Sequence, residues 1–420
     1  MERLFKGEAY RLTGYGIKIK NVFFCELVSL MSLLSLKSFM PIIKTKIDSN
    51  VYQNRRDKII SLLSKGHLDV LLVTDSANIR YLTGFTGGDG YLLLKKSGST
   101  LISDPRYTIQ IGEECNNIDV RICRLGELTK TIRSLIEERK QIKFGVEADS
   151  ITLLEYNKIV EAFPKFEFVP TKGFVSELRQ IKDRSEVDAI RCAIDAAYKA
   201  FSDIRNEISA VLATKSKTHV TIIETEIRND LEYLMRKHGA SEKSFASIVC
   251  SGKRAAMAHG VPDNYDITKE QLLLIDWGAI VNGYMSDLTR VLIVKPQNSK
   301  LKKIYDIVLK AQTEAIKAIK PGKKCSEIDA IARNIISDNG YAKNFGHGLG
   351  HSLGLEIHEN PRFSPADNTI LKSGMVITVE PGIYIKDWGG IRIEDDILVT
   401  KNGCEILSNH VPKNFDECIL

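Results

Sequence analysis

The stretch LLLIDWGAIVNGYMSDLTRVLIV, residues 272–294, carries the clearest fold signal in the chain. Two apolar, β-rich runs flank the dipeptide Asn282-Gly283, which is typical of a two-residue type I′ turn between antiparallel strands. Such a turn pairs Val281 with Tyr284, and every facing pair further along the two strands follows from that pair. The turn therefore predicts the register of the whole hairpin.

This register places two aspartates close together. Asp276 faces Thr289, and Asp287 lies two residues before Thr289 on the same face of the sheet. Their Cα atoms are expected roughly 6–8 Å apart. Carboxylates among apolar residues are costly to bury unless cations compensate them. Lys or Arg partners are one explanation and metal ions the other. We favour metal ions, because Arg290 lies on the opposite face.

A second segment, GHGLGHSLGLEIHENP at 346–361, places His347, His351 and His358 within twelve residues. Its glycines permit tight backbone paths and the close approach of a ligand. Histidine is the commonest transition-metal ligand and carries protons near neutral pH. The alternative is a glycine-rich loop with incidental histidines, and the density of histidines argues against it. The spacing is not that of the HExxH zinc motif.

A third segment, VEPGIYIKDWGGIRIEDDILV at 379–399, adds Glu380, Arg392 and Glu394. Glu380 precedes Pro381 and is expected to end a strand. Arg392 and Glu394 alternate with apolar residues, so we expect them to share one face of a strand. Taken alone, Glu380 is explained equally well as a solvated turn residue, and Glu394 as the partner of Arg392 or of a lysine.

The three segments together contain four carboxylates and an imidazole that suit two divalent ions with bridging carboxylates: Asp276, Asp287, His351, Glu380 and Glu394. Four carboxylates nearly balance two dications, and ions held in this way generate a nucleophile by lowering the pKa of water. His259 lies in SGKRAAMAHGVP at 251–262, and composition alone favours a surface-loop histidine there.

Length and composition exclude several classes of protein. A chain of 420 residues with 43% hydrophobic and 27% charged residues is typical of a globular protein of two or three domains. The net charge of +6 comes without a concentrated basic block, which argues against nucleic-acid binding. The eight cysteines form no CxxC pair, so we expect reduced thiols in a cytoplasmic protein.

Residues 1–50 form an extension with eight basic and four acidic residues, a net charge of +4. The apolar run at 22–36 is interrupted by Glu26 and is too short to span a bilayer, so no stable membrane insertion is expected. The extension is explained either as an organelle-targeting segment or as a mis-assigned start with Met31 or Met40 as the initiator.

Two domains are expected after the extension. Residues 51–175 alternate strands and helices, with DVLLVT at 69–74 as a buried strand, which indicates an α/β domain. The segment 177–202 predicts one long amphipathic helix that connects this domain to the next. Residues 176–420 predict an α+β domain, with a helix at 219–237 ahead of the hairpin.

The order and spacing of these motifs resemble the Xaa-Pro aminopeptidases (aminopeptidase P) and Xaa-Pro dipeptidases (prolidases) of the methionine-aminopeptidase clan. The resemblance runs from about Arg55 to about Leu407, and it includes NIRYLTGF at 78–85, DPRY at 104–107 and the ELRQIKD connector. It implies an α+β protein with a C-terminal pita-bread (creatinase/aminopeptidase) catalytic domain behind an N-terminal α/β creatinase/prolidase-like domain.

The resemblance also implies a role for each residue of the site. The five ligands of a dinuclear centre are all present, with Asp287 and Glu394 as the bridging pair. The family's three non-ligand active-site histidines match His259, His347 and His358, and Arg392 and Tyr384 match an arginine and a tyrosine behind the metals. In the implied mechanism, a hydroxide that bridges the two ions attacks the carbonyl before proline, with Glu380 as general base or proton carrier.

We therefore expect a metallo-aminopeptidase that acts on peptides with proline at the second position and forms a homodimer or homotetramer. Its two divalent ions are expected to be Mn²⁺, with Co²⁺ or Zn²⁺ as alternatives. The compact loop at 346–354 and the short catalytic domain favour the aminopeptidase over an Xaa-Pro dipeptidase. A catalytically inactive pita-bread binding module is a more distant alternative. Methionine aminopeptidase lacks such an N-terminal domain, and creatinase lacks the ligand set.

Overall fold

The computed structural model describes residues 49–124, 126–136, 141–213, 221–294 and 299–420. The interpretation of residues 1–50 falls almost entirely outside these ranges. None of the helices within them is both long enough and apolar enough to cross a membrane.

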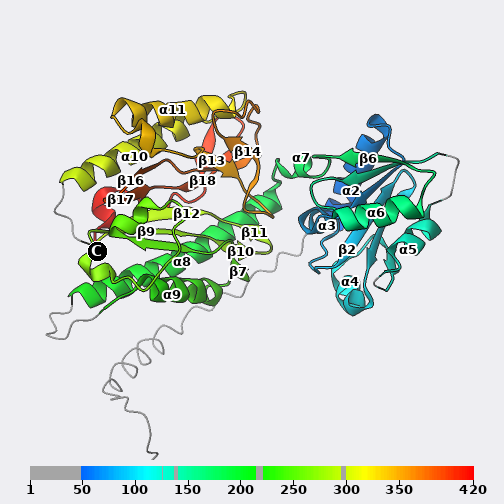
Figure 1. Cartoon of the computed structure of the whole chain (residues 1–420), viewed down its shortest axis with the longest axis horizontal. Coiled ribbons are helices and arrows are strands. Elements are labelled where there is room, and N and C mark those ends of the chain that lie inside the picture. The colour runs from blue at the N-terminus through cyan, green and yellow to red at the C-terminus, as the bar shows by residue number, and fades with distance from the viewer. Residues whose placement is uncertain (1–48, 125, 137–140, 214–220, 295–298) are drawn as a thin grey trace, which may run out of the picture. The chain divides into compact units, whose positions relative to one another are not determined.

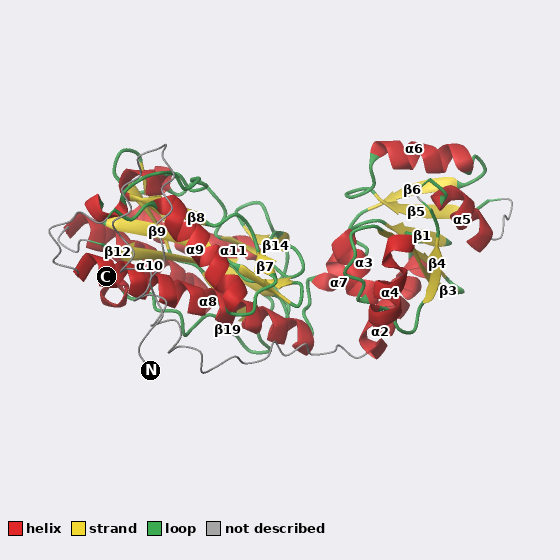
Figure 2. Cartoon of the chain, turned by 90° about the horizontal axis from the view of Figure 1, so that it is seen from below, coloured by secondary structure: helices red, strands yellow, loops and turns green. Residues whose placement is uncertain are grey.

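The N-terminal domain is built on one six-stranded sheet of order β4-β3-β2-β1-β5-β6. Alternate residues of the central strand point to opposite faces. Leu71 and Val73 pack with α2 and α3, whereas Val70 and Leu72 pack with α5 and α6 (Figure 2). The elements are α2 (Ser49–Lys65), β1 (Val70–Val73), α3 (Ser76–Thr83), β2 (Gly90–Lys95), β3 (Gly98–Ser103), α4 (Thr108–Glu114), β4 (Asp119–Ile122), α5 (Leu128–Leu135), β5 (Lys143–Glu147), α6 (Leu153–Ala162) and β6 (Glu167–Thr171).

The connector is two helices and not the single helix expected at 177–202. A short α7 (Ser176–Arg179) precedes α8 (Arg184–Ala213). The Asp183 side chain accepts a hydrogen bond from the Glu186 backbone N–H, and the Glu186 side chain accepts one from the Asp183 N–H. This reciprocal capping starts a new helix within the predicted one.

The C-terminal domain has its strands between two pairs of helices, α8 with α9 (Glu224–Lys237) and α10 (Ser299–Ala318) with α11 (Cys325–Asp338) (Figure 1). The strands form sheets of order β12-β9-β8, β11-β10-β7, β14-β13-β15-β18-β19 and β16-β17. They are β7 (Glu242–Lys243), β8 (Ile248–Ser251), β9 (Leu272–Trp277), β10 (Ala279–Val281), β11 (Tyr284–Met285), β12 (Leu288–Ile293), β13 (Gly350–Ser352), β14 (Glu359–Phe363), β15 (Val376–Val379), β16 (Gly382–Ile385), β17 (Gly389–Arg392), β18 (Asp395–Val399) and β19 (Cys404–Ile406).

The hairpin has the register predicted from its turn. Val281 pairs with Tyr284 and Asp276 with Thr289. Asn282 and Gly283 both have positive φ, 52° and 85°, as a type I′ turn requires. On β9, Leu273 and Ile275 join the core under α8 and α9, whereas Leu274 joins the core under α10 and α11. Strand alternation therefore turns Asp276 toward the space between the two halves of the domain.

Two expectations about this domain were wrong in detail. Helix α9 begins at Glu224 and not near residue 219, because Ile223 is held in a β-bridge with Asp266. Arg392 and Glu394 do not share one strand, since β17 ends at Arg392 and β18 begins at Asp395. The backbone changes partner between these strands, because the Glu394 N–H donates to the Thr289 carbonyl of the hairpin. This change of partner brings Glu394 beside the hairpin that carries both aspartates.

Candidate metal and active site

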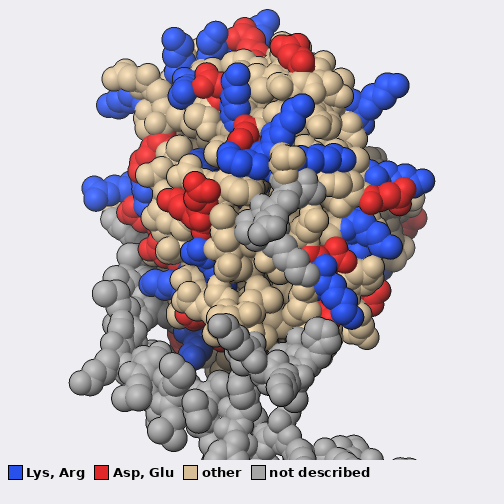
Figure 3. Space-filling view, turned by 90° about the vertical axis from the view of Figure 1, so that its left-hand side faces the viewer, with Lys and Arg blue, Asp and Glu red and all other residues tan. Residues whose placement is uncertain are grey.

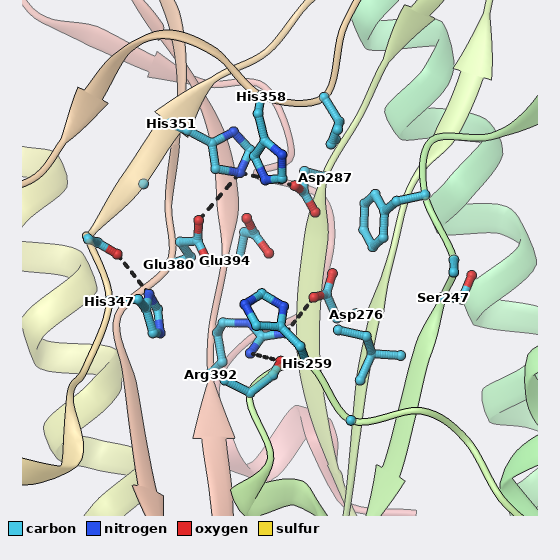
Figure 4. A pocket seen from close by; sticks show the side chains of 18 of the residues that line it. Ser247, His259, Asp276, Asp287, His347, His351, His358, Glu380, Arg392 and Glu394 are labelled. Carbon is cyan, nitrogen blue, oxygen red and sulfur yellow. Dashed lines mark hydrogen bonds and ion pairs between the residues drawn. The ribbon is translucent and has the colours of Figure 1, made fainter.

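All nine predicted metal-ligand and catalytic residues line a single cavity of about 680 Å³ (Figure 4). They come from segments far apart in the chain: β9, the turn before β12, β13, the residue after β15, the end of β17, the link between β17 and β18, and three loops. Because no short stretch contains the site, the packing of the two halves of the domain is what assembles it.

Three of the predicted ligands form the tightest group. One ligand atom from each of Asp287, His351 and Glu394 lies within 4.8 Å of the other two. His351 Nε2 lies 3.5 Å from Asp287 Oδ2 and 3.5 Å from Glu380 Oε1. The Thr378 hydroxyl donates to Glu380 and accepts the His351 backbone N–H, so it links these two ligands from behind.

The four carboxylates are buried together, and this makes their ionisation unfavourable. Burial, and then repulsion by Glu394 and the other acids, raises the pKa of Asp287 well above its usual value. The pKa of Glu394 is raised for the same two reasons. Burial also raises the pKa of Asp276, and it raises that of Glu380 to about 8. A site of this kind needs cations to hold its carboxylates in the ionised form.

Two carboxylate oxygens in the cavity wall are ready to accept such cations. Asp276 Oδ1 and Glu394 Oε1 are buried, and neither has a hydrogen-bond partner in the described part of the chain. Orphaned buried acceptors are rare, and divalent metals satisfy them directly. A donor set of carboxylate oxygens with one imidazole therefore fits divalent ions.

Asp276 has a cationic partner from outside the hairpin. Arg392 reaches it from β17 and pairs with Oδ2. Arg392 also donates to the Thr289 hydroxyl at 3.0 Å and to the Tyr384 hydroxyl at 2.7 Å. One arginine compensates one of the four carboxylates, so the salt bridge does not remove the need for metal ions.

The cavity histidines are biased toward their neutral forms. Burial, and then the charge of Arg392, lowers the pKa of His347 to about 4. Burial also lowers the pKa of His351 to about 4 and depresses that of His358, whose ring lies 4.4 Å from the His351 ring. His347 Nε2 lies 3.0 Å from the Tyr384 hydroxyl. A neutral imidazole can bind a metal through one ring nitrogen and donate a hydrogen bond from the other.

Sequence reasoning missed Arg362, which also lines the cavity. Its side chain is exposed on β14, and its positive charge contributes to the low pKa values of His351 and His358. Within the described ranges, its guanidinium has neither an ion pair nor a hydrogen bond. The signal in the sequence was its position four residues after His358, at the end of the histidine-rich segment.

Comparison with known proteins agrees with this geometry. Residues 188–401 match metallopeptidase family M24, and residues 55–181 match the creatinase/prolidase N-terminal domain. An Xaa-Pro dipeptidase of Pyrococcus horikoshii is 37% identical over 364 residues, which cover 86% of this chain and 98% of the relative.

Two solved structures are similar over most of both chains. The Xaa-Pro dipeptidase from Bacillus anthracis is 37% identical, with a TM-score of 0.79 and coverage of 88% of this chain and 100% of that one. The X-Pro aminopeptidase from Thermotoga maritima is 33% identical, with a TM-score of 0.76 and coverage of 87% and 99%. The chain thus belongs to metallopeptidase family M24, and its pita-bread catalytic domain follows a creatinase/prolidase N-terminal domain.

Proposed function

We propose that this M24 metallopeptidase is an Xaa-Pro dipeptidase, which hydrolyses a dipeptide whose second residue is proline. This proposal replaces the aminopeptidase expected from the short catalytic domain. The support from relatives comes from the dipeptidases of P. horikoshii and B. anthracis, both 37% identical, compared with 33% for the T. maritima aminopeptidase. The observation that carries the proposal is the unpaired charge of Arg362 in the cavity.

A dipeptide differs from a longer substrate by its free carboxylate directly after proline. Four cationic side chains line the cavity. Arg392 pairs with Asp276, Lys243 pairs with Glu232, and Arg228 donates to the neighbouring Asn229. The Asn229 amide is neutral, so the charge of Arg228 is not compensated either. Arg362 is distinguished because its charge acts on His351 and His358 at the proposed metal site, and because its guanidinium has no hydrogen-bond partner among the described residues. A guanidinium binds a carboxylate through two parallel hydrogen bonds, so Arg362 is suited to the carboxylate of a dipeptide.

The residues assigned to hold two divalent ions are Asp276, Asp287, His351, Glu380 and Glu394. Mn²⁺ is the proposed ion, because oxygen-rich sites suit it better than the sulfur-rich sites preferred by softer metals. Ions bound there supply Lewis-acid polarisation of the scissile carbonyl and activation of water.

The proton transfers and the binding of the substrate are assigned to side chains of the cavity. Glu380 is assigned to take up a proton and deliver it to the departing proline nitrogen. His259 and His358 are assigned to donate hydrogen bonds to the developing oxyanion and to the substrate. His347 has its ring nitrogens against the Gly348 carbonyl and the Tyr384 hydroxyl, so it is assigned to contact the substrate from the cavity wall. Tyr384 lies within hydrogen-bond distance of His347 and holds that ring in place. Arg392 holds Asp276 against the hairpin.

The deciding experiment compares Ala-Pro with Ala-Pro-Ala as substrates of the purified protein, with Mn²⁺, Co²⁺ and Zn²⁺ added in parallel. Cleavage of Ala-Pro with at most trace cleavage of the tripeptide is expected. Cleavage of the tripeptide at a comparable rate would make the protein an aminopeptidase. Failure with both substrates and all three metals would favour the binding module.

A further inference from the structure

The three loops that carry the non-ligand histidines share a feature that lies outside the cavity. Each loop donates at least one backbone N–H to a buried carboxylate that does not line the cavity, and each carboxylate is paired with an arginine. The carboxylate–arginine pairs are Glu224 with Arg254, Asp329 with Arg333, and Glu359 with Arg179. These pairs bind the backbone of the loops that carry His259, His347 and His358, respectively.

The first pair closes both ends of loop 251–263. Glu224, which is fully buried at the start of α9, accepts hydrogen bonds from the Ser251 N–H at 2.7 Å and the Asp263 N–H at 3.1 Å. It also accepts one from Arg254 Nε at 3.0 Å, and the same guanidinium donates to the Val261 carbonyl at 2.6 Å. The loop is thereby tied before and after His259, whose own side chain is exposed.

The second pair holds the segment around His347. Asp329 on α11 is 1% exposed and accepts the Leu349 N–H at 3.0 Å. Arg333 donates to both oxygens of Asp329, at 2.7 and 2.8 Å. The same guanidinium donates to the carbonyls of Phe345 and His347, at 3.2 and 2.8 Å. The backbone on both sides of His347 is therefore bound to one ion pair.

The third pair lies behind His358. Glu359 accepts the backbone N–H groups of Leu355 and Glu356, at 3.1 and 3.3 Å. Its two carboxylate oxygens also accept hydrogen bonds from the Arg179 guanidinium and the Lys182 ammonium group, which belong to the connector before α8. Leu353 and Leu355 anchor the start of this loop in the core. The His358 side chain itself is exposed, so these hydrogen bonds hold the backbone between that anchor and the histidine.

We propose that Glu224, Asp329 and Glu359 are positioning residues, each of which sets the place of its own loop histidine in the active site. The proposal rests on the proposed peptidase function and deepens it. Buried ion pairs add little net stability, because desolvation offsets their attraction. Displacement of a catalytic group by about 1 Å, in contrast, costs on the order of 100-fold in rate. A positional role explains why all three loops use this costly arrangement.

The test is a crossed set of double-mutant cycles in the full-length, metal-loaded enzyme. Glu224→Gln and Asp329→Asn are each combined with His259→Ala and with His347→Ala, and kcat/KM for Ala-Pro is measured. Each single carboxylate variant is expected to lose roughly tenfold or more. In the His259→Ala background, Glu224→Gln should lower kcat/KM by less than about twofold further, because the histidine that it positions is already gone. In the His347→Ala background, Glu224→Gln should lower kcat/KM by the same factor as it does in the wild type. Asp329→Asn should behave the opposite way, with its small further loss in the His347→Ala background.

Each cycle serves as the matched control for the other, because both carboxylates are buried, arginine-paired and bound to a loop. Equal additional losses in both backgrounds would show a general structural effect and overturn the proposal. So would wild-type kcat/KM in either single variant. If Glu224→Gln fails to fold, Arg254→Lys replaces it in the test. Arg254 is partly exposed, and a lysine lacks the planar guanidinium that bonds Glu224 and the Val261 carbonyl at the same time.

A second readout does not depend on peptidase activity. In the metal-free protein, Glu224→Gln should speed amide hydrogen exchange in 252–262 but not in 345–349, and Asp329→Asn should do the opposite. If the wild-type protein has no Xaa-Pro activity, the proposed function is wrong. The hydrogen-exchange pattern then still tests whether each carboxylate positions its own loop. Faster exchange in both loops of either variant would overturn the positional role.

Discussion

Arg392 and Asp276 form a buried ion pair between two strands, and one oxygen of that aspartate, Oδ1, remains without a hydrogen-bond partner among the described residues. The pair connects β17 to the hairpin, while the free oxygen points to the space where the other carboxylates gather (Figure 4). A single carboxylate is thus shared between the protein's own cation and the proposed metal site.

Replacing Arg392→Met should destabilise the metal-free protein more than the Mn²⁺-loaded protein. Without the arginine, Asp276 is a buried charge with no compensation, which costs as much as about 3 kcal/mol, whereas bound ions supply the missing positive charge. Melting temperatures with EDTA and with Mn²⁺ measure the difference. Arg191→Met, which breaks a part-exposed pair with Glu405, is the control and should lower both temperatures little and equally.

Asp287→Asn should abolish Ala-Pro hydrolysis and reduce bound metal, as should Asp287→Ala. The amide keeps the shape but removes the carboxylate whose pKa is raised by burial and by the neighbouring acids. For the same reason, the metal-free Asn variant should melt at a higher temperature than metal-free wild type, while gaining less from Mn²⁺. Full activity with normal metal content would contradict the dinuclear site.

Arg362→Gln should raise KM for Ala-Pro by roughly 10–100-fold, the value of a lost charge-assisted hydrogen bond. Since Ala-Pro-amide has no carboxylate, its slow cleavage should be unaffected by the substitution. Steady-state kinetics on both substrates provide the comparison. Equal effects on the two would remove the assigned role of Arg362.

The Glu359 cluster should make stability depend on pH in acid. Burial alone would raise the pKa of Glu359, but Lys182 and Arg179 outweigh burial and hold it below the usual 4.5. A depressed pKa means that this stabilisation is present above the unfolded-state value and is lost as pH falls through the folded-state value. The stability gap between metal-free wild type and metal-free Glu359→Gln should therefore shrink as the pH falls from about 6 to about 3. A constant gap in chemical denaturation would contradict this.

The charged side chains on the face shown in Figure 3 do not indicate a functional site, unlike those in the cavity. On the face shown in Figure 3, basic and acidic side chains are interspersed over the described residues, so no single sign covers it.

The amino-acid sequence by itself determined the hairpin and predicted which ionisable side chains line the cavity. A type I′ turn fixes strand pairing locally, and strand alternation then places Asp276 opposite Thr289 and near Asp287. Only the tertiary structure decided that Arg392 pairs with Asp276, that Glu394 lies beside Thr289, and that three buried carboxylates hold the histidine loops. These partners are up to 116 residues apart, and they meet because separate sheets and helices pack around one space. Local propensity and periodicity carry no information about such packing, so the sequence predicts which groups are present but not which of them touch.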